Sequence, residues 1–469
     1  MRQFKQAARD QVSSTNHQPP TTNHLRSLNR VERWGLWLLG ISFVLLLFPI
    51  ELRSAFLKRP MTDLQVYLRA AWAVRTGHDL YSIIDDNKWH YHYPAVFAIL
   101  MVPLANTPAG EHQAWWHLRM HESVFIWHFF TLICLFVSAH WLASALEEKS
   151  KNLSLRSQPR FCARWWALRV WPVLALIAPV SQTILRGQVN LLVLALLCAM
   201  MAAALRGQSW RAGIWLAGAI CVKLIPAFLL LYPLRRRDWR WLGGCTVGLF
   251  VGLALIPSVV FGPRKAWDYT LEWSNVLMRP VLNRGGDHAR DKELVEATAT
   301  DSQSPLRIIH FAMYPHLATR PADAAPWVRQ AHWLIGGLLT IGTLWSMGRR
   351  NLAGTELVIG MGALIIVMLM LSPVTHQHYL CLMLPSVAGL IVWAWEKRGP
   401  TWLTGVLLVL LPFMSVAMAI PFIPGFGVLR DHGLPGFTAI LLLGISCIVL
   451  HRASQASTAV QIVETRLAA

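Results

Sequence analysis

Residues 242–261 read LGGCTVGLFVGLALIPSVVF, 20 residues without a charged side chain. A helix of about this length crosses the hydrocarbon core of a bilayer, which is about 30 Å thick. We therefore expect a transmembrane helix here, and similar stretches recur along the chain to give about ten full crossings. The other predicted spans are 34–51, 122–145, 165–181, 189–205, 332–347, 354–372, 378–395, 401–420 and 436–451.

The composition of the whole chain supports this interpretation. Hydrophobic residues make up 55% of the 469 residues, and charged residues only 14%. A soluble domain is about 25% charged, whereas the mean hydropathy of this chain is +0.42. The predicted fold class is therefore an all-α polytopic membrane protein, in which lipid is the solvent for the apolar helix faces.

The net charge of +19 comes from short basic clusters in alternate loops. This is the positive-inside pattern, which fixes orientation in the membrane, and it argues against a nucleic-acid partner. Both termini are expected in the cytoplasm, with 1–33 as a disordered N-terminus, 34–451 as a single membrane domain and 452–469 as a tail. The clusters lie at 26–33, 149–164, 206–211, 235–240, 349–350 and 397–398.

Two shorter apolar pieces, 212–221 and 224–234, interrupt the series of spans. Both flanks are basic, so we expect a re-entrant helical pair that enters the membrane and returns, with Lys223 at its tip. An ammonium group in an apolar segment commonly marks a site for an anion. A lysine can also extend its head group to the interface, so both interpretations of Lys223 remain open.

The first outer loop, 52–92, contains a candidate helix that opens with Thr62 and Asp63. Its apolar residues recur at helical spacing, which predicts an amphipathic helix on the membrane surface that stops near Gly77. Asp63 is either a general base at that surface or a group that caps or complements the helix N-terminus. The apolar positions are Leu64, Tyr67, Leu68, Ala71 and Trp72.

Other polar residues fall in outer turns, on the same predicted side of the membrane as Asp63. Arg186 is a phosphate contact or an ordinary loop charge. Gln188 and Asn190 are hydrogen-bond partners for a sugar or for a broken helix end. A large outer loop, 262–331, carries further charges and Gln303.

Four histidines also lie in these turns, where they suit phosphate binding, metal binding or ordinary aromatic-belt positions. They are His90, His92, His376 and His378. The seven cysteines fall in predicted spans or one inner loop, and no Cys/His metal spacing occurs. We therefore expect neither a disulfide framework nor a metal site.

Short motifs follow one another along most of the chain. The early ones are Asp63 to Tyr67, Leu80-Tyr81, Tyr93-Pro94 and Pro103 to Ala105. The later ones are Gly187 to Asn190, Arg211 through Lys223 to Pro226, Ser302 to Ser304, and Ser372-Pro373 with His378. In order and spacing, these motifs resemble those of glycosyltransferase family 87. The resemblance covers about 62–380, and the chain departs from the family pattern at Ala95, Ser302, His376 and Tyr379.

The resemblance implies a GT-C architecture and the transfer of one sugar, commonly mannose, from a polyprenyl-phosphate sugar to a glycan or glycolipid acceptor. It implies a reaction at the outer face of the cell (inner or plasma) membrane, among membrane lipids and without a cofactor. Asp63 matches the family's base. No second acidic residue stands out in the motifs, which favours inversion at the anomeric carbon. The implied substrate contacts are Tyr67, His90, Tyr93, Arg186, Gln188, Asn190, Lys223, Gln303, His376 and His378.

Two other classes of protein also have many spans and intramembrane charges. A flippase for lipid-linked sugars predicts charges spread through a central cavity and internal pseudo-symmetry. An O-antigen ligase or polymerase predicts its key Arg and His residues in one dominant outer loop. Neither pattern stands out in this sequence.

Overall fold

The computed structural model describes residues 62–468, apart from gaps at 87, 109, 151–160, 282–292, 296, 299–300, 350 and 397–400, together with positions 34, 37 and 41. Within these residues every regular element is a helix, and the three β-bridges are isolated. The prediction of an all-α protein is therefore confirmed. The expected span 34–51 and the expected disordered N-terminus lie outside the described part.

Five helices of the described part are long and apolar enough to cross a membrane, and a bent pair of helices makes a sixth if it counts as one span. The multi-pass character is thus confirmed, but the count of ten crossings is not. The five are α5 (Met120–Lys149), the run Trp239–Phe261, the run Gln377–Trp395, α20 (Thr401–Ala419) and the run Leu434–Gln455 within α22 (Leu434–Ala468).

Two expected spans, 189–205 and 354–372, are apolar helices of only 16 and 17 residues, shorter than the roughly 20 that a full crossing needs. Polar residues of the motifs lie at one end of each helix. These helices are α9 (Asn190–Leu205) and α18 (Thr355–Leu371), whereas α10 (Ser209–Val222), with 14 residues, belongs to the region expected to be re-entrant.

The expected straight span 165–181 is instead two helices, α7 (Ala163–Ala175) and α8 (Ile177–Arg186), which meet at 66°. Pro179 has no amide hydrogen to donate to the carbonyl of Ala175. The chain therefore leaves helical geometry at Leu176, whose φ and ψ are −116° and 22°. The bend turns the end of α8, with Arg186, toward residues that lie far away in the sequence.

The region expected to be re-entrant forms a helical hairpin. α10 runs up to Lys223, and the chain returns through η3 (Ile225–Leu230) and α11 (Leu231–Arg236). Ser209 at the start of the hairpin donates a hydrogen bond to Asp238 at its end, 2.8 Å away. Both basic flanks therefore lie at the same end, and Lys223 lies at the tip, as the sequence predicts.

The first outer loop contains α3 (Thr62–Thr76), which ends before Gly77, whose φ is +78°. Its expected place along the membrane surface stays a prediction, but neither face of the helix is open. Residues 64–73 are all buried, including Gln65 and Arg69. Later segments cover the polar side of α3, since Arg69 Nη2 donates to Asn106 Oδ1 at 2.6 Å. The helix packs against α4 (Ala95–Met101) and η2 (Val102–Leu104).

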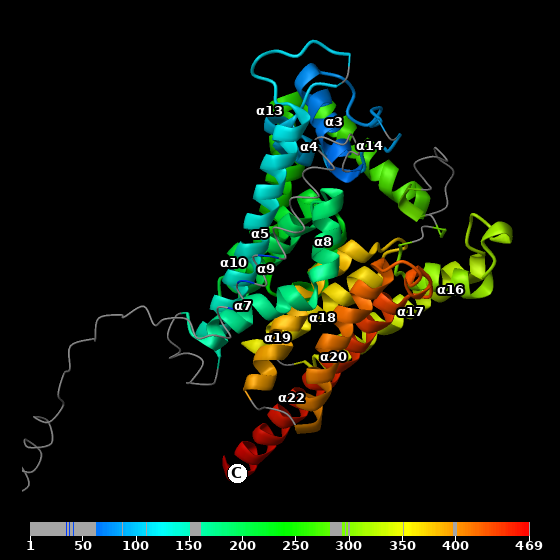
Figure 1. Ribbon diagram of the computed structural model, residues 1–469. Coiled ribbons are helices and arrows are strands. Elements are labelled where there is room, and N and C mark those ends of the chain that lie inside the picture. The colour runs from blue at the N-terminus through cyan, green and yellow to red at the C-terminus, as the bar shows by residue number, and fades with distance from the viewer. Residues whose placement is uncertain are drawn as a thin grey trace, which may run out of the picture.

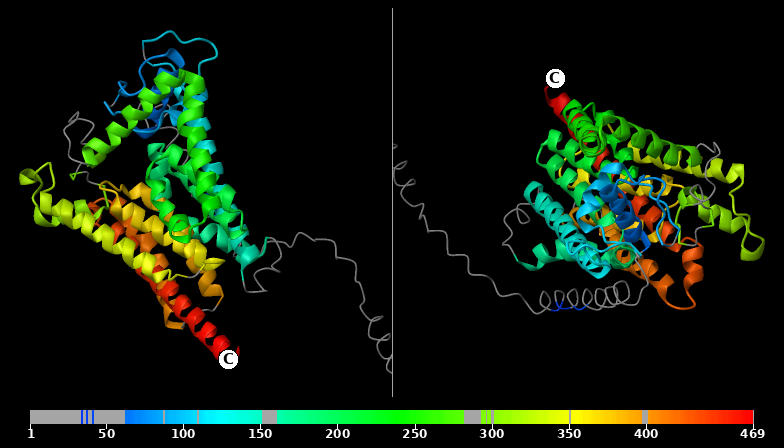
Figure 2. Two further views of the ribbon diagram at one scale, coloured as in Figure 1. Left: turned by 180° about the vertical axis from the view of Figure 1, so that it is seen from behind. Right: turned by 90° about the horizontal axis from the view of Figure 1, so that it is seen from above.

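The outer-loop helices gather at one end of the molecule, and the C-terminus lies at the other (Figure 1). In the view from above, α3 lies near the middle of the molecule (Figure 2). The helix α14 (Pro263–Val281) begins directly after the run Trp239–Phe261. It contacts the first outer loop, because Tyr269 Oη accepts a hydrogen bond from Leu80 N at 3.3 Å. This end also holds α13 (Ile256–Phe261) and α14 (Pro263–Val281).

Candidate active site

A cavity of about 790 Å³ lies beneath the outer-loop helices. This volume is within the range of small-molecule sites, about 300–1,000 Å³. One part of its wall is apolar and comes from the hairpin tip, α14, α17 (Pro326–Ser346) and α18: Leu224, Ile225, Phe228, Leu277, Met278, Trp333, Met368 and Leu371. The other part is polar.

Eight of the eleven site residues predicted from the sequence line this cavity. They come from α3, the end of the first outer loop, the end of α8, the hairpin tip and the loop after α18, so the fold collects segments that are far apart in the chain. These residues are Asp63, Tyr67, His90, Tyr93, Arg186, Gln188, Lys223 and His376.

The other three, Asn190, Gln303 and His378, are buried behind the lining. Asn190 Oδ1 accepts a hydrogen bond from Lys223 Nζ at 3.0 Å. Gln303 Nε2 donates to the carbonyl of Arg430 at 3.3 Å, and its Oε1 accepts from Gly436 N at 3.1 Å. The ring of His378 stacks on that of His376, with centroids 5.3 Å apart. Asn190 and His378 therefore contact residues that line the cavity, and Gln303 contacts the backbone near the start of α22.

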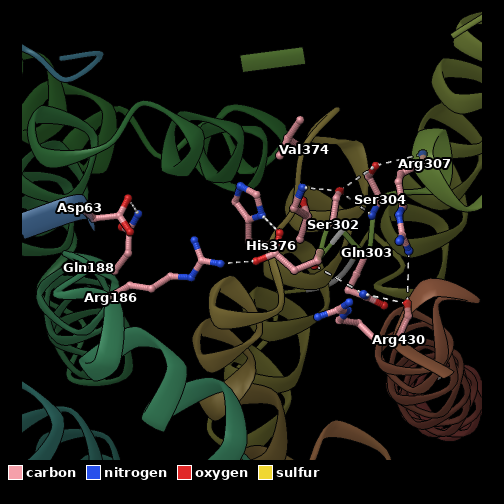
Figure 3. Close-up of polar contacts among 12 residues, drawn as sticks. Asp63, Arg186, Gln188, Ser302, Gln303, Ser304, Arg307, Val374, His376 and Arg430 are labelled. Atoms are coloured by element: carbon pink, nitrogen blue, oxygen red, sulfur yellow. Dashed lines mark hydrogen bonds and ion pairs between the residues drawn. The ribbon is translucent and has the colours of Figure 1, made fainter. Parts of the chain in front are cut away.

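Asp63 lies in the first turn of α3, where Gln188 Nε2 donates a hydrogen bond to its Oδ1 at 2.7 Å (Figure 3). Tyr67 Oη donates to Gln188 Oε1 at 3.1 Å and lies 2.9 Å from Tyr93 Oη. The amide of Gln188 is therefore held at both ends. Burial raises the pKa of Asp63, although Arg186, His376, Lys223 and the Gln188 hydrogen bond oppose this rise.

Asp301 joins two of the predicted site residues. Its Oδ2 accepts from Arg186 Nη2 and its Oδ1 from His376 Nδ1, each at 2.6 Å. Burial opposes ionisation of Asp301, but the His376 hydrogen bond and the charges of His376 and Arg186 outweigh it and hold the pKa well below its usual value.

The backbone fixes this arrangement. Ser302 and His376 form an isolated antiparallel bridge, Gln303 N donates to the carbonyl of Thr375 at 2.6 Å, and Gln377 N donates to that of Asp301 at 3.1 Å. The Ser302 segment and the loop after α18 therefore run side by side, as the dashed contacts in Figure 3 show.

Glu293, from the large outer loop, binds two histidines of the first outer loop. Its Oε1 lies 2.8 Å from His90 Nδ1 and its Oε2 lies 2.5 Å from His92 Nε2. Burial opposes ionisation of Glu293, but hydrogen bonds from His92 and His90 lower its pKa. Within the described residues, no group of three or more His, Cys, Asp or Glu is arranged to hold a metal ion.

Lys223 is partly buried at the hairpin tip. Besides its bond to Asn190, its Nζ lies 3.5 Å from the centroid of the Tyr379 ring, a cation–π contact. Lys223 lines the cavity together with Asp63 and Arg186.

No second acidic residue stands out in the motifs, but Asp301 and Glu293 both line the cavity together with Asp63. Their environments differ from that of Asp63, whose pKa is raised while theirs are lowered. When carboxyl groups share a site, a difference between their pKa values indicates which of them acts as acid or base. Of the three, only Asp63 has a raised pKa.

The family model for glycosyltransferase family 87 matches residues 91–373. The chain belongs to this family. It is a glycosyltransferase, and the resemblance inferred from the motifs is confirmed. The matched region includes Arg186, Gln188, Lys223 and Asp301, whereas Asp63 precedes it.

Two curated relatives are named as mannosyltransferases. This family 87 glycosyltransferase is 26% identical over 347 residues to the polyprenol-phosphate-mannose-dependent alpha-(1-2)-phosphatidylinositol mannoside mannosyltransferase of Mycobacterium tuberculosis, across 72% of this chain and 71% of the relative. It is 25% identical to the protein of the same name from Mycolicibacterium smegmatis, across 73% and 72% of the two chains.

Among solved structures, the chain is similar to ArnT from Cupriavidus metallidurans bound to undecaprenyl phosphate. The match has a TM-score of 0.37 and 14% identity, and it covers 92% of this chain and 80% of that chain. A likeness at this level carries no argument about the site.

Proposed function

We propose that this glycosyltransferase transfers a mannosyl residue from a polyprenyl-phosphate mannose to a hydroxyl group of a glycan or glycolipid acceptor. The observation that carries the proposal is a cavity in which one basic carboxylate, Asp63, lies near two cations, Arg186 and Lys223. The mannose-dependent relatives support the choice of donor sugar.

In the proposed reaction, Asp63 takes the proton of the acceptor hydroxyl group while the oxygen of that hydroxyl group attacks the anomeric carbon. The bond from that carbon to the phosphate oxygen breaks, and polyprenyl phosphate leaves with the bonding electron pair. Lys223 and Arg186 stabilise the negative charge that develops on the phosphate. The base must lie within hydrogen-bond reach of the hydroxyl, which the position of Asp63 on the cavity wall permits.

A single displacement of this kind inverts the anomeric carbon. Retention would need a carboxylate nucleophile beside the sugar. The other two carboxylates, Asp301 and Glu293, are each held by two cationic or hydrogen-bonding partners. Such pairing reduces nucleophilicity, which supports inversion with Asp63 as the only base.

The apolar part of the wall suits the polyprenyl chain, because Leu224, Phe228 and Trp333 extend the cavity from the cationic groups toward apolar surface. We further propose a GT-C architecture in the cell membrane, with both termini in the cytoplasm and the cavity facing outward. The basic flanks of the hairpin, at the end of α10 and α11 opposite Lys223, support this orientation.

The test is an assay of the purified protein in detergent or vesicles, with polyprenyl phosphates carrying mannose or glucose and with sugar-bearing glycolipids as acceptors. We expect release of polyprenyl phosphate and a mannosylated product that depends on the acceptor. Release of polyprenyl phosphate from the glucose donor alone would show that the proposed donor sugar is wrong. Movement of the donor across the vesicle membrane without release of polyprenyl phosphate would favour a flippase.

A further inference from the structure

Asp301 and Asp63 lie near the same guanidinium group from different sides. Arg186 Nη2 binds Asp301 at 2.6 Å, and Arg186 is also the charge that acts most strongly on Asp63. In Figure 3 the side chain of Arg186 extends from the side of Asp63 and Gln188 toward His376. One cation is therefore shared between two carboxylates.

The fold fixes Asp301 more firmly than it fixes Arg186. The backbone of Asp301 accepts hydrogen bonds from Gln377 N and Gln303 Nε2, and its carboxylate binds His376. Arg186 lies in the last turn of α8, and its side chain is 35% exposed. The position of the guanidinium therefore depends on Asp301.

We propose, on the basis of the function proposed above, that Asp301 is a positioning residue. It holds the Arg186 guanidinium on the side away from Asp63, where it can bind the donor phosphate, and so preserves the basicity of Asp63. Asp301 touches neither substrate in this proposal and acts through Arg186.

The electrostatic reasoning is direct. A cation within about 4–6 Å of a carboxylate lowers its pKa by about one to three units. Without Asp301, Arg186 would interact more fully with Asp63, so the pKa of Asp63 would fall and the base would weaken. The groups that face Asp63 from the surrounding elements are Tyr67, Tyr93, Arg186, Gln188, Lys223, His376 and Tyr379.

The experiment measures the titration of Asp63 in the full-length protein by two routes. The first is the acidic limb of kcat/KM in the transferase assay. The second is the pH dependence of carbodiimide labelling at Asp63, read by mass spectrometry, because only the protonated carboxyl group reacts. The second route needs no activity, so failure of the proposed function and failure of this inference are distinguishable.

We expect Asp301→Asn to move both the acidic limb and the labelling midpoint to lower pH by about one unit. Its kcat/KM should fall by about tenfold to a hundredfold, because the base is weaker and Arg186 is misplaced. Asp301→Glu keeps the charge and should retain the wild-type midpoint. The control Asp323→Asn changes an exposed carboxylate next to α17 and should change neither quantity.

The variant Arg186→Gln tests whether Asp301 acts on Asp63 through Arg186. It should move the labelling midpoint of Asp63 to higher pH, and adding Asp301→Asn to it should produce no downward shift. An unchanged labelling midpoint of Asp63 in Asp301→Asn would overturn the proposal. So would a downward shift of the midpoint in the Arg186→Gln background that equals the shift produced by Asp301→Asn alone.

Discussion

Gln188 donates a hydrogen bond to Asp63 across 2.7 Å, although the two residues are 125 positions apart in the chain. Gln188 follows Gly187, which has a φ of +67° and ends α8. Tyr67 fixes the other end of the Gln188 amide. The carboxylate is thus oriented by the turn between α8 and α9 as well as by its own helix.

The first prediction concerns Asp63→Asn. Asparagine keeps the size of the side chain and is a good helix cap, but it cannot accept a proton. Loss of a general base costs about 10²–10⁴-fold in rate, whereas loss of a cap costs about 1 kcal/mol of stability. We expect normal insertion, retained donor binding and at least a hundredfold slower release of polyprenyl phosphate.

A matched control is Asp268→Asn, which changes an exposed carboxylate on α14. It should keep the wild-type rate. Activity of Asp63→Asn within a few-fold of wild type would assign Asp63 a capping role.

The second prediction concerns Gln188→Met. The hydrogen bond from Gln188 lowers the pKa of Asp63, so its loss should raise that pKa further. A base must be deprotonated to work, so the acidic limb of kcat/KM should move to higher pH, opposite in sign to the shift expected for Asp301→Asn. A pH–rate profile measures this, and a shift to lower pH would contradict the assigned hydrogen bond.

The third prediction concerns Lys223→Met, which keeps an apolar stem and removes the charge. Loss of one charge-assisted contact should weaken donor binding by about 1.5–3 kcal/mol, or about one to two decades in KM for the polyprenyl-phosphate sugar. The KM for the acceptor should change little. Wild-type kinetics would mean that the ammonium does not bind the donor.

The fourth prediction concerns helix packing. A Cβ atom at Gly213 would lie 2.1 Å from the carbonyl oxygen of Trp241, where α10 meets α12 (Trp239–Leu249). Gly213→Ala should therefore lower the free energy of unfolding by about 1–3 kcal/mol, despite the better helix propensity of alanine. Gly337→Ala on α17 has open space around it and should leave the melting temperature unchanged or higher.

The fifth prediction concerns topology. In a background without the seven free cysteines, a cysteine at exposed Ser82 should react with an impermeant reagent added from outside. A cysteine at exposed Gln208, near the basic flank of the hairpin, should not. Labelling at Gln208 alone would invert the proposed orientation.

Sequence reasoning found the residues whose chemistry is unusual for their surroundings. Lys223 stood out as a charge in an apolar segment, and Asp63 stood out at the start of a helix beside a membrane. Asp301 and Glu293 did not, because acidic residues are ordinary in a polar outer loop. Only their partners, Arg186, His376, His90 and His92, make them part of the site.

The fold was predictable in class and less so in detail. Hydropathy identifies apolar segments, but it does not show where a helix stops. The break at Leu176 depends on a missing amide hydrogen at Pro179. The burial of α3 depends on α4 and η2, which cover it from later in the chain.

The contact of Glu293 with His90 and His92 has a consequence for protein engineering. A chimaera that exchanges only the first outer loop with that of a relative would place foreign side chains against Glu293 and leave a partly buried carboxylate without its two donors. The same holds for a chimaera that exchanges only residues 262–331. The two loops should therefore be transplanted together, and random mutagenesis that alters acceptor choice should recover paired changes, one in each loop.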